Sequence, residues 1–273
     1  KTAPSAADER AGAAGIARVS DLRERQPGKS FPVTVRGVIT YIDLSFDFFY
    51  IQDGPDGIMV GNQLGARLAP FLKQEGSYIE LEAATVTNQP VLMAMSPARI
   101  LGRGQIPEPL HHTLDYLMTG RDDGQWVQVE GVVSACEEHR LTLSVLGGRL
   151  MVWINELDKD SRSRLVGCQV RVNGVCSPLT TMRNQRLGVR LLVSSGAHIE
   201  VVTRPPKDPF NLRAQGIGRL LQSDGRQASV PTALVKTVGV VTHREPLMLF
   251  IQDGTEGLRV LLRKDGVVGP GDQ

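Results

Sequence analysis

The chain has 273 residues, 41% of them hydrophobic and 22% charged, which is typical of a globular protein and excludes a disordered or fibrous chain. The formal net charge is +2, and residues 1–105 and 106–204 each carry 11 basic and 11 acidic residues. No segment therefore has the concentrated positive charge that neutralises nucleic-acid phosphates. No run of about 18 apolar residues occurs, so we expect no membrane-spanning helix in this sequence.

The first 15 residues are rich in Ala and Gly and predict a loose lead-in. Because the sequence starts at Lys1 without Met, we expect a processed or excised piece of a longer protein. Ser20 before DLRERQ is typical of a helix cap, and Pro27-Gly28 ends the predicted helix.

From residue 32 the hydrophobic period becomes two, which predicts a half-buried strand bent at Gly37. A hairpin follows, with strands at 48–52 and 57–62 joined by an Asp-Gly turn. After one or two helical turns at 66–73, YIELEA predicts a strand with Ile79 and Leu81 facing inward. A last strand is expected within 91–101.

The hairpin occurs twice, as FFYIQDGPDGIMV at 48–60 and MLFIQDGTEGLRV at 248–260. Self-similarity of this kind indicates a repeated structural unit. A middle copy is predicted to contain a helix and four strands, at 113–118, 126–135, 141–145, 149–154 and from 167. A third copy has a helix at 217–221 and a strand around Gly239 before the second hairpin.

Five short strands, a bent first strand and a longer third-to-fourth connection describe the OB fold, a five-stranded Greek-key barrel. We predict an all-β protein with short helices, built from tandem OB-fold barrels, two complete and a third truncated. The predicted domains are 1–105 with its N-terminal helix, 106–204, and 205–273 with three strands. Pro-rich connectors between them indicate fixed spacing. The open edge of the third module leads us to expect that the natural protein continues past Gln273.

The succession DLRERQPGKSFPVTVRGVITY, FFYIQDGPDGIMV, LMTGRDDGQWVQVEGVVSA and DPFNLRAQGIGRLL resembles the N-terminal extracytoplasmic region of bacterial membrane-bound sensor histidine kinases. GRDDGQWVQVEGVV is the most specific part of this resemblance. The strand pattern also resembles the broader OB-fold nucleic-acid-binding superfamily. The kinase resemblance implies a region on the periplasmic side, tethered to the inner membrane by a segment outside this sequence. Kinase chemistry does not carry over, because no phosphoacceptor helix or nucleotide-binding glycine box is present.

No catalytic, metal or cofactor site is predicted. Asp53-Gly54 and Asp253-Gly254 have the residues that a hairpin turn needs, which favours a structural role over an acidic site. The five histidines lack the spacing of metal ligands and are expected to be solvent-exposed or in linkers. The cysteines are expected to be small buried thiols without a disulfide; they are Cys136, Cys168 and Cys176.

Aromatic side chains on the second strand are the candidate binding groups, because OB folds stack the bases of single strands on such side chains. If Phe49 and Ile51 face the core, Phe48 and Tyr50 face outward. Burial of these aromatics by the preceding helix or a neighbouring module is the structural alternative. The predicted ligand-binding residues are Arg36, Tyr41, Phe48, Tyr50 and Phe250.

We favour a non-catalytic sensory region that binds an unknown small ligand or protein and passes on the signal by reorienting its modules. An OB-fold protein that binds single-stranded nucleic acid is one alternative, and a structural protein-interaction module is another. The balanced charge disfavours nucleic acid as the partner.

Overall fold

A computed structural model describes residues 16–24, 28–43, 45–61, 75–181, 185–208, 211–221, 235–262 and 268–272. The chain divides into two compact units, Lys1–Val202 and Thr203–Gln273. The predicted lead-in at 1–15 and the predicted helical turns at 66–73 lie outside the described residues. No helix in the described part of the chain has both the length and the apolar character needed to cross a membrane.

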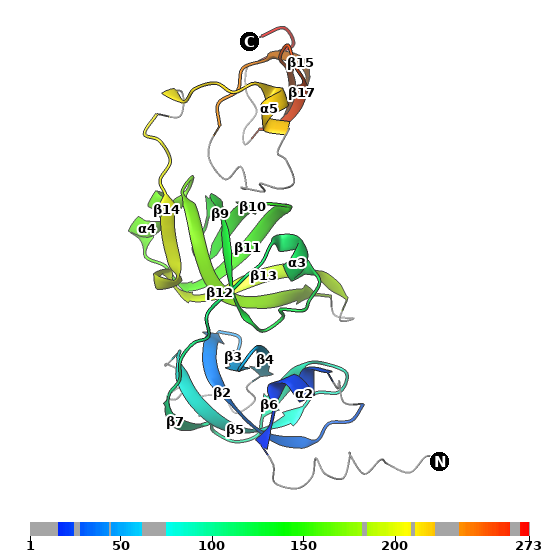
Figure 1. Cartoon of the computed structure of the whole chain (residues 1–273), viewed down its shortest axis with the longest axis vertical. Coiled ribbons are helices and arrows are strands. Elements are labelled where there is room, and N and C mark those ends of the chain that lie inside the picture. Colours follow the sequence, from blue (N-terminus) through cyan, green and yellow to red (C-terminus); the bar gives the residue numbers. More distant parts are fainter. Residues whose placement is uncertain are drawn as a thin grey trace, which may run out of the picture. The chain divides into compact units, whose positions relative to one another are not determined.

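The first unit contains two closed five-stranded barrels (Figure 1). The strands of the first barrel are β2 (Pro32–Asp43), β3 (Phe48–Asp53), β4 (Asp56–Gly61), β5 (Ser77–Thr85) and β6 (Val91–Ala94). Those of the second are β9 (Trp126–Cys136), β10 (Arg140–Val145), β11 (Gly148–Glu156), β12 (Gln169–Thr180) and β13 (Arg186–Ser195).

Both barrels have the same strand order. It runs β2-β3-β4-β6-β5 in the first and β9-β10-β11-β13-β12 in the second, and each closes by pairing its fourth strand with its first. This is the order of the OB fold, so the prediction of tandem OB-fold barrels is confirmed.

The same short elements flank each barrel. A two-residue strand runs parallel to the first barrel strand, β1 (Ile16–Ala17) on β2 and β8 (Leu110–His111) on β9, and a short helix follows, α2 (Val19–Glu24) or α3 (Leu114–Met118). An extra strand ends each copy, β7 (Arg99–Arg103) or β14 (Ile199–Thr203). In the second barrel, α4 (Lys159–Leu165) lies in the third-to-fourth connection and η2 (Gly196–His198) precedes β14. The single last strand predicted within 91–101 is therefore two strands, β6 and β7.

Alternation along the strands builds the barrel cores. Ile79 and Leu81 are 1% exposed, as predicted from YIELEA, and Phe49 and Ile51 are fully buried in the same core. Gly37 lies where β2 bends over β3, and a Cβ added there would lie 3.0 Å from the Gln52 carbonyl oxygen. Close approach of the two backbones thus favours glycine at the predicted bend.

The second unit contains three antiparallel strands, β15 (Val240–Glu245), β16 (Met248–Gln252) and β17 (Gly257–Leu261), with α5 (Ile217–Leu221) beside them. The strand predicted around Gly239 begins only after it. An isolated parallel bridge between Ala214 and Lys236 corresponds to the β1–β2 pairing of the first unit. Asp253 accepts the Ile217 N–H at 2.6 Å, so the turn of the hairpin caps α5.

Two of the three cysteines, Cys168 and Cys176, are buried in the core of the second barrel, and all three are free thiols. Cys136 is only half-buried, so the prediction of small buried thiols is right for two of the three.

Candidate functional site at the junction of the two barrels

Two of the predicted binding residues are buried where the barrels meet. Tyr41 is 0% exposed and Tyr50 is 3% exposed, and the half-buried Phe48 ring lies beside both. Residues of the second barrel cover them; these are Trp126, Val175, Leu192 and the half-buried Trp153. A neighbouring module thus covers the outward aromatics. Ligand binding by these rings stays a prediction, and stacking a base on either tyrosine would require the barrels to separate.

The other two predicted residues lie elsewhere. Arg36 on β2 donates from Nε to Glu80 Oε2 at 2.8 Å, and Arg99 donates to the other oxygen of Glu80 at 2.6 Å. These bonds, from Arg36 above all, hold the pKa of Glu80 below its ordinary value. Phe250 belongs to the second unit, where its ring lies 5.7 Å from that of His243. Within the first unit, Tyr41, Phe48 and Tyr50 therefore lie together at the junction, and Arg36 is paired with Glu80 instead.

Polar contacts fix the buried aromatics across the junction. Tyr41 Oη donates to Asn155 Oδ1 at 2.8 Å, and Tyr50 Oη donates to Ser177 Oγ at 3.2 Å. Asn155 Nδ2 in turn donates to the Ile42 carbonyl oxygen at 2.6 Å. Burial raises the pKa of Tyr50 to about 12 and that of Tyr41 further. Both side chains are therefore neutral hydrogen-bond donors at any physiological pH.

The segment GRDDGQW joins the hairpin of the first barrel to the second barrel. Gly124 has a φ of +82°, and a Cβ on it would lie 2.5 Å from the Gly57 carbonyl oxygen. A Cβ on Gly57 would in turn overlap the Gly124 carbonyl group. Two residues on, the Trp126 N–H donates to Gln52 Oε1 at 3.0 Å. Glycine at both positions thus permits direct backbone contact between the barrels.

Charged groups hold the rest of this segment. Arg186 binds both carboxylate oxygens of Asp123, at 2.7 and 2.9 Å. Arg23 from α2 donates to the Arg121 carbonyl oxygen at 3.0 Å and pairs with Asp56 at 3.2 Å. The most specific block of the sequence resemblance is therefore the junction itself. In the sequence, Gly120 and Gly124 on either side of Asp122 and Asp123, just before a strand, indicate a tight turn. They do not indicate that this turn contacts the first barrel.

Asp122 in this segment is a buried carboxyl group. It is 4% exposed, and the Nδ1 atom of His112 lies 3.7 Å from Asp122 Oδ2. Burial raises the pKa of Asp122, while the charges of His112 and Arg23 partly oppose that shift and the charge of Asp123 adds to it. The folded protein therefore holds a proton here at pH values where the unfolded chain has lost it.

Asp122→Asn is expected to stabilise the first unit at neutral pH, by about 1 kcal/mol or less. Because the folded pKa is raised, stability falls as pH rises from the ordinary carboxyl value through the folded pKa. The amide keeps the shape of the side chain and removes this slope. Urea unfolding between pH 4 and pH 7.5 measures it, with Asp115→Asn, on α3, as the control. Lower stability of Asp122→Asn at pH 7 would show instead that the charged carboxylate holds the loop.

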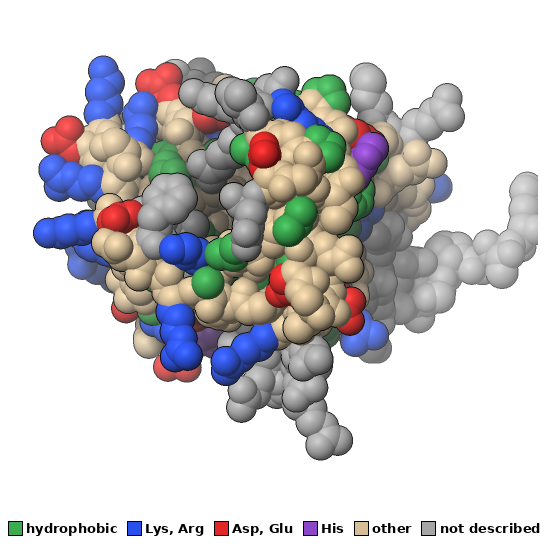
Figure 2. All heavy atoms as spheres, turned by 90° about the horizontal axis from the view of Figure 1, so that it is seen from above, with side chains coloured by type: hydrophobic (Ala, Val, Ile, Leu, Met, Phe, Trp, Pro, Cys, Tyr) green, Lys and Arg blue, Asp and Glu red, His purple; other side chains and the backbone are tan. Residues whose placement is uncertain are grey.

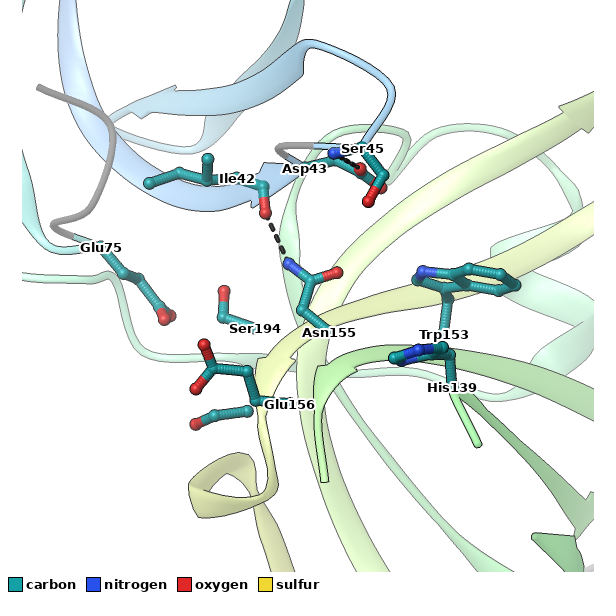
Figure 3. A pocket seen from close by; sticks show the side chains of 10 residues that line it. Ile42, Asp43, Ser45, Glu75, His139, Trp153, Asn155, Glu156 and Ser194 are labelled. Carbon is teal, nitrogen blue, oxygen red and sulfur yellow. Dashed lines mark hydrogen bonds between the residues drawn. The ribbon is translucent and has the colours of Figure 1, made fainter. Parts of the chain in front are cut away.

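A cleft of about 540 Å³ opens beside the junction (Figure 3). Side chains of both barrels line it; they are Ile42, Asp43, Ser45, Glu75, His139, Trp153, Asn155, Glu156, Ser194 and Ser195. The rings of His139 and Trp153 stack at a centroid distance of 6.1 Å. In Figure 3, Asn155 lies between this aromatic pair and the carboxylates of Glu75 and Glu156. The cleft thus has an aromatic side and an acidic side.

The histidines around the cleft correct part of the sequence prediction. His139 is exposed as expected, but His198 is half-buried, with its Nε2 2.9 Å from Glu75 Oε1 and its ring 5.1 Å from that of Trp126. His112 also packs, 4.1 Å from the Tyr116 ring. His198 is held by partners that are distant in sequence, and His112 packs on a ring of the helix that follows it. The spacing of the histidines along the chain does not reveal these contacts.

The chemistry of the cleft favours a ligand that donates hydrogen bonds. Among the described residues that line it, three are carboxylates and none is Lys or Arg. The Asp43 carboxylate is already engaged: its Oδ1 accepts the N–H groups of Ser45 and Phe46, and its Oδ2 lies 3.1 Å from the Tyr41 hydroxyl oxygen. Glu156 and the hydroxyls of Ser194 and Ser195 lie at the wall. An anion would meet repulsion here, whereas a cationic or hydroxyl-rich molecule with one flat face would fit.

No family model matches the sequence, and no curated protein matches it. Among solved structures, the tetrameric p202 HIN2 is similar at 13% identity, over 65% of this chain and 96% of that one, with a TM-score of 0.32. A murine DNA binding protein bound with ds DNA is similar at 13% identity, over 64% and 99%, with a TM-score of 0.32. A putative aspartyl-tRNA synthetase from Leishmania major Friedlin is similar at 18% identity and a TM-score of 0.28; the match covers 42% of this chain and spans 26% of the synthetase. The strand order, and not these likenesses, identifies the fold.

Proposed function

We propose that the first unit is a non-catalytic binding region whose two OB barrels hold a small molecule in the cleft between them. The observation that carries this proposal is a cleft of about 540 Å³ with one aromatic and one acidic side, at a junction fixed by Asn155. This volume lies within the range of small-molecule sites. The ligand is a cationic or hydroxyl-rich molecule with a flat face that packs on Trp153.

The cleft is suited to sensing because both barrels contribute to it. Ile42, Asp43 and Glu75 come from the first barrel, and Trp153 and Glu156 come from the second. A ligand that binds more tightly to one arrangement of the barrels shifts the population toward that arrangement. Since Asn155 accepts from Tyr41 and donates to the Ile42 carbonyl group, a ligand that competes for either bond acts directly on the junction.

Intrinsic fluorescence provides the test, because the chain contains two tryptophans. Trp126→Phe leaves Trp153, at the wall of the cleft, as the reporter. We expect screening against cationic and hydroxyl-rich metabolites to identify a ligand that changes Trp153 emission and raises the melting temperature. Glu156→Gln should weaken its binding, whereas Glu138→Gln, on the same barrel outside the cleft lining, should leave it unchanged. Equal effects of the two changes would count against the cleft.

We further propose that this binding region is the input of a membrane-bound signalling protein, a sensor histidine kinase, and lies on the periplasmic side of the inner membrane. The support is the sequence resemblance carried by GRDDGQWVQVEGVV and the repeated IQDG hairpin. In the full-length protein, an alkaline-phosphatase fusion placed after the third module should be active. If only a cytoplasmic reporter fused at the same point is active, the periplasmic placement is refuted.

Single-stranded nucleic acid is the second candidate ligand. The observation that favours it is the outer face of β10 and β11, the strand pair that OB folds use for this purpose, which carries Trp153, Met151 and the exposed Arg149. The balanced charge of residues 106–204 argues against it.

Titration with a labelled oligothymidine at low and high salt distinguishes the two candidates. If nucleic acid is the ligand, Arg149→Ala should weaken salt-sensitive binding and Glu156→Gln should not. If the cleft binds a small molecule, Glu156→Gln should weaken the binding of that molecule and Arg149→Ala should not. Tyr50→Ala does not separate them, because Tyr50 is covered by the second barrel.

A further inference from the structure

Two hairpins of nearly the same sequence have different surroundings. In the first unit, Gln52 is 4% exposed and Gly57 is buried, because the second barrel covers them. In the second unit, the corresponding Gln252 and Gly257 are both exposed. The two hairpins therefore differ in whether a neighbouring barrel covers them, and not in their own sequence.

The local geometry of the two hairpins agrees. Gln52 pairs with Gly57 across β3 and β4, and Gln252 pairs with Gly257 across β16 and β17. Behind each hairpin, a threonine hydroxyl of the preceding strand donates to a backbone carbonyl group. Thr40 donates to the Tyr50 carbonyl oxygen at 3.5 Å, and Thr242 donates to that of Phe250 at 3.2 Å. Tyr50 and Phe250 each lie two residues before the glutamine of their hairpin. The face that the first barrel offers to its neighbour is thus formed again by β15, β16 and β17.

This face of the second unit has room for a close backbone approach. A Cβ on Gly257 would meet only the Ile251 carbonyl oxygen, at 3.8 Å, whereas a Cβ on Gly57 would overlap its neighbour. A hollow of about 400 Å³ lies at the same face; it is lined by Val238, Gly239, Val240, Thr242, Gln252, Asp253 and Gly254. Val238 and Val240 are each 43% exposed. Figure 2, a view from above, shows hydrophobic side chains interspersed on the surface with Lys and Arg around its outline.

We propose that the β15–β17 face binds a further barrel module of the same kind, through a glycine turn that precedes the first strand of that module. In the junction of the first unit, Gly124 packs on Gly57, and Gln52 accepts the N–H of Trp126. On the second unit, Gly257 receives the glycine of the turn, and Gln252 accepts the N–H two residues after it. Phe250 packs beneath the incoming side chain, in the place of Tyr50.

The partner is a further module, because the glycine turn of the second barrel already contacts the first barrel and is not free to bind the second unit. Its Gly124 and Trp126 contact the first barrel, and its Asp123 is paired with Arg186. A second copy of this chain would have to open that junction before its loop could bind. This proposal does not depend on the small-molecule cleft.

The test extends the full chain by a flexible Gly-Ser linker and a second copy of residues 113–128, which include the turn and the tryptophan. A short flexible linker gives millimolar effective concentration, so weak docking becomes observable. We expect amide hydrogen exchange at residues 252–257 to slow by about tenfold in the extended chain. Unchanged exchange in a folded extended chain would overturn the proposal.

Matched variants make the result specific. Gly124→Val in the appended copy should abolish the protection, because that glycine has a positive φ and no space for a side chain. Gly257→Val should do the same without unfolding the hairpin, since its Cβ meets no close atom. Gln252→Ala should weaken protection. Protection that persists in all three variants would overturn the proposal, as would self-association of the unextended chain that Gly257→Val removes, because the occupant would then be a second copy.

Discussion

Gly124→Val is expected to lower the free energy of unfolding of the first unit by about 2–6 kcal/mol. The new side chain has two costs. A β-branched residue at a φ of +82° is strained by about 1–3 kcal/mol, and overpacking against Gly57 costs a similar amount. Since a domain is typically stable by about 5–15 kcal/mol, the junction is expected to open in this variant before the barrels unfold. Denaturant unfolding followed by Trp126 emission measures both effects.

Two further glycine variants separate the cost of backbone strain from the cost of overpacking. Gly57→Val keeps an ordinary φ but would overlap the Gly124 carbonyl group, so it should show the packing cost alone. Gly28→Val, where a Cβ meets no atom within 4 Å, is the control and should change stability by less than about 0.5 kcal/mol. If Gly124→Val were as mild as Gly28→Val, the backbone contact between the barrels would not stabilise the unit.

The barrel plan could be predicted because it depends on local patterns. Alternation over 77–85 places Ile79 and Leu81 in the core, and a glycine at the centre of the first strand, Gly37 or Gly131, marks the bend in each of the two barrels. The repeated hairpin gives the register directly, and both copies pair as expected. These features need information from only a few neighbouring residues.

The junction and the cleft could not be predicted in the same way. Tyr50 donates to Ser177, 127 positions away, and Tyr41 donates to Asn155, 114 positions away. An outward aromatic looks the same in sequence whether it binds a ligand or a neighbouring barrel. The sequence does contain a signal for one residue of the cleft. Trp153 alternates with the core residues Val152 and Ile154, which marks it as an outward aromatic of the second barrel.

Trp126→Ala is expected to cost about 3–5 kcal/mol, the usual range for removing a buried tryptophan. Its side chain is 3% exposed and packs with Tyr41 and Tyr50 across the junction and against the His198 ring. Trp153→Ala removes the same group from a half-buried position and is the matched comparison, with an expected cost of about half as much.

The two tryptophan variants also test whether the cleft depends on the junction. Trp126 does not line the cleft, so its loss removes no contact with a bound ligand. If the cleft exists only while the barrels are held together, Trp126→Ala should weaken ligand binding as the junction opens, in proportion to the population of the separated form. Trp153→Ala should weaken binding directly, and because Trp153 is only half-buried in the junction cluster, it should open the junction less than Trp126→Ala does, as judged by Trp126 emission. Ligand affinity that is unaffected by Trp126→Ala, in a variant with the expected loss of stability, would show that one barrel alone forms the site.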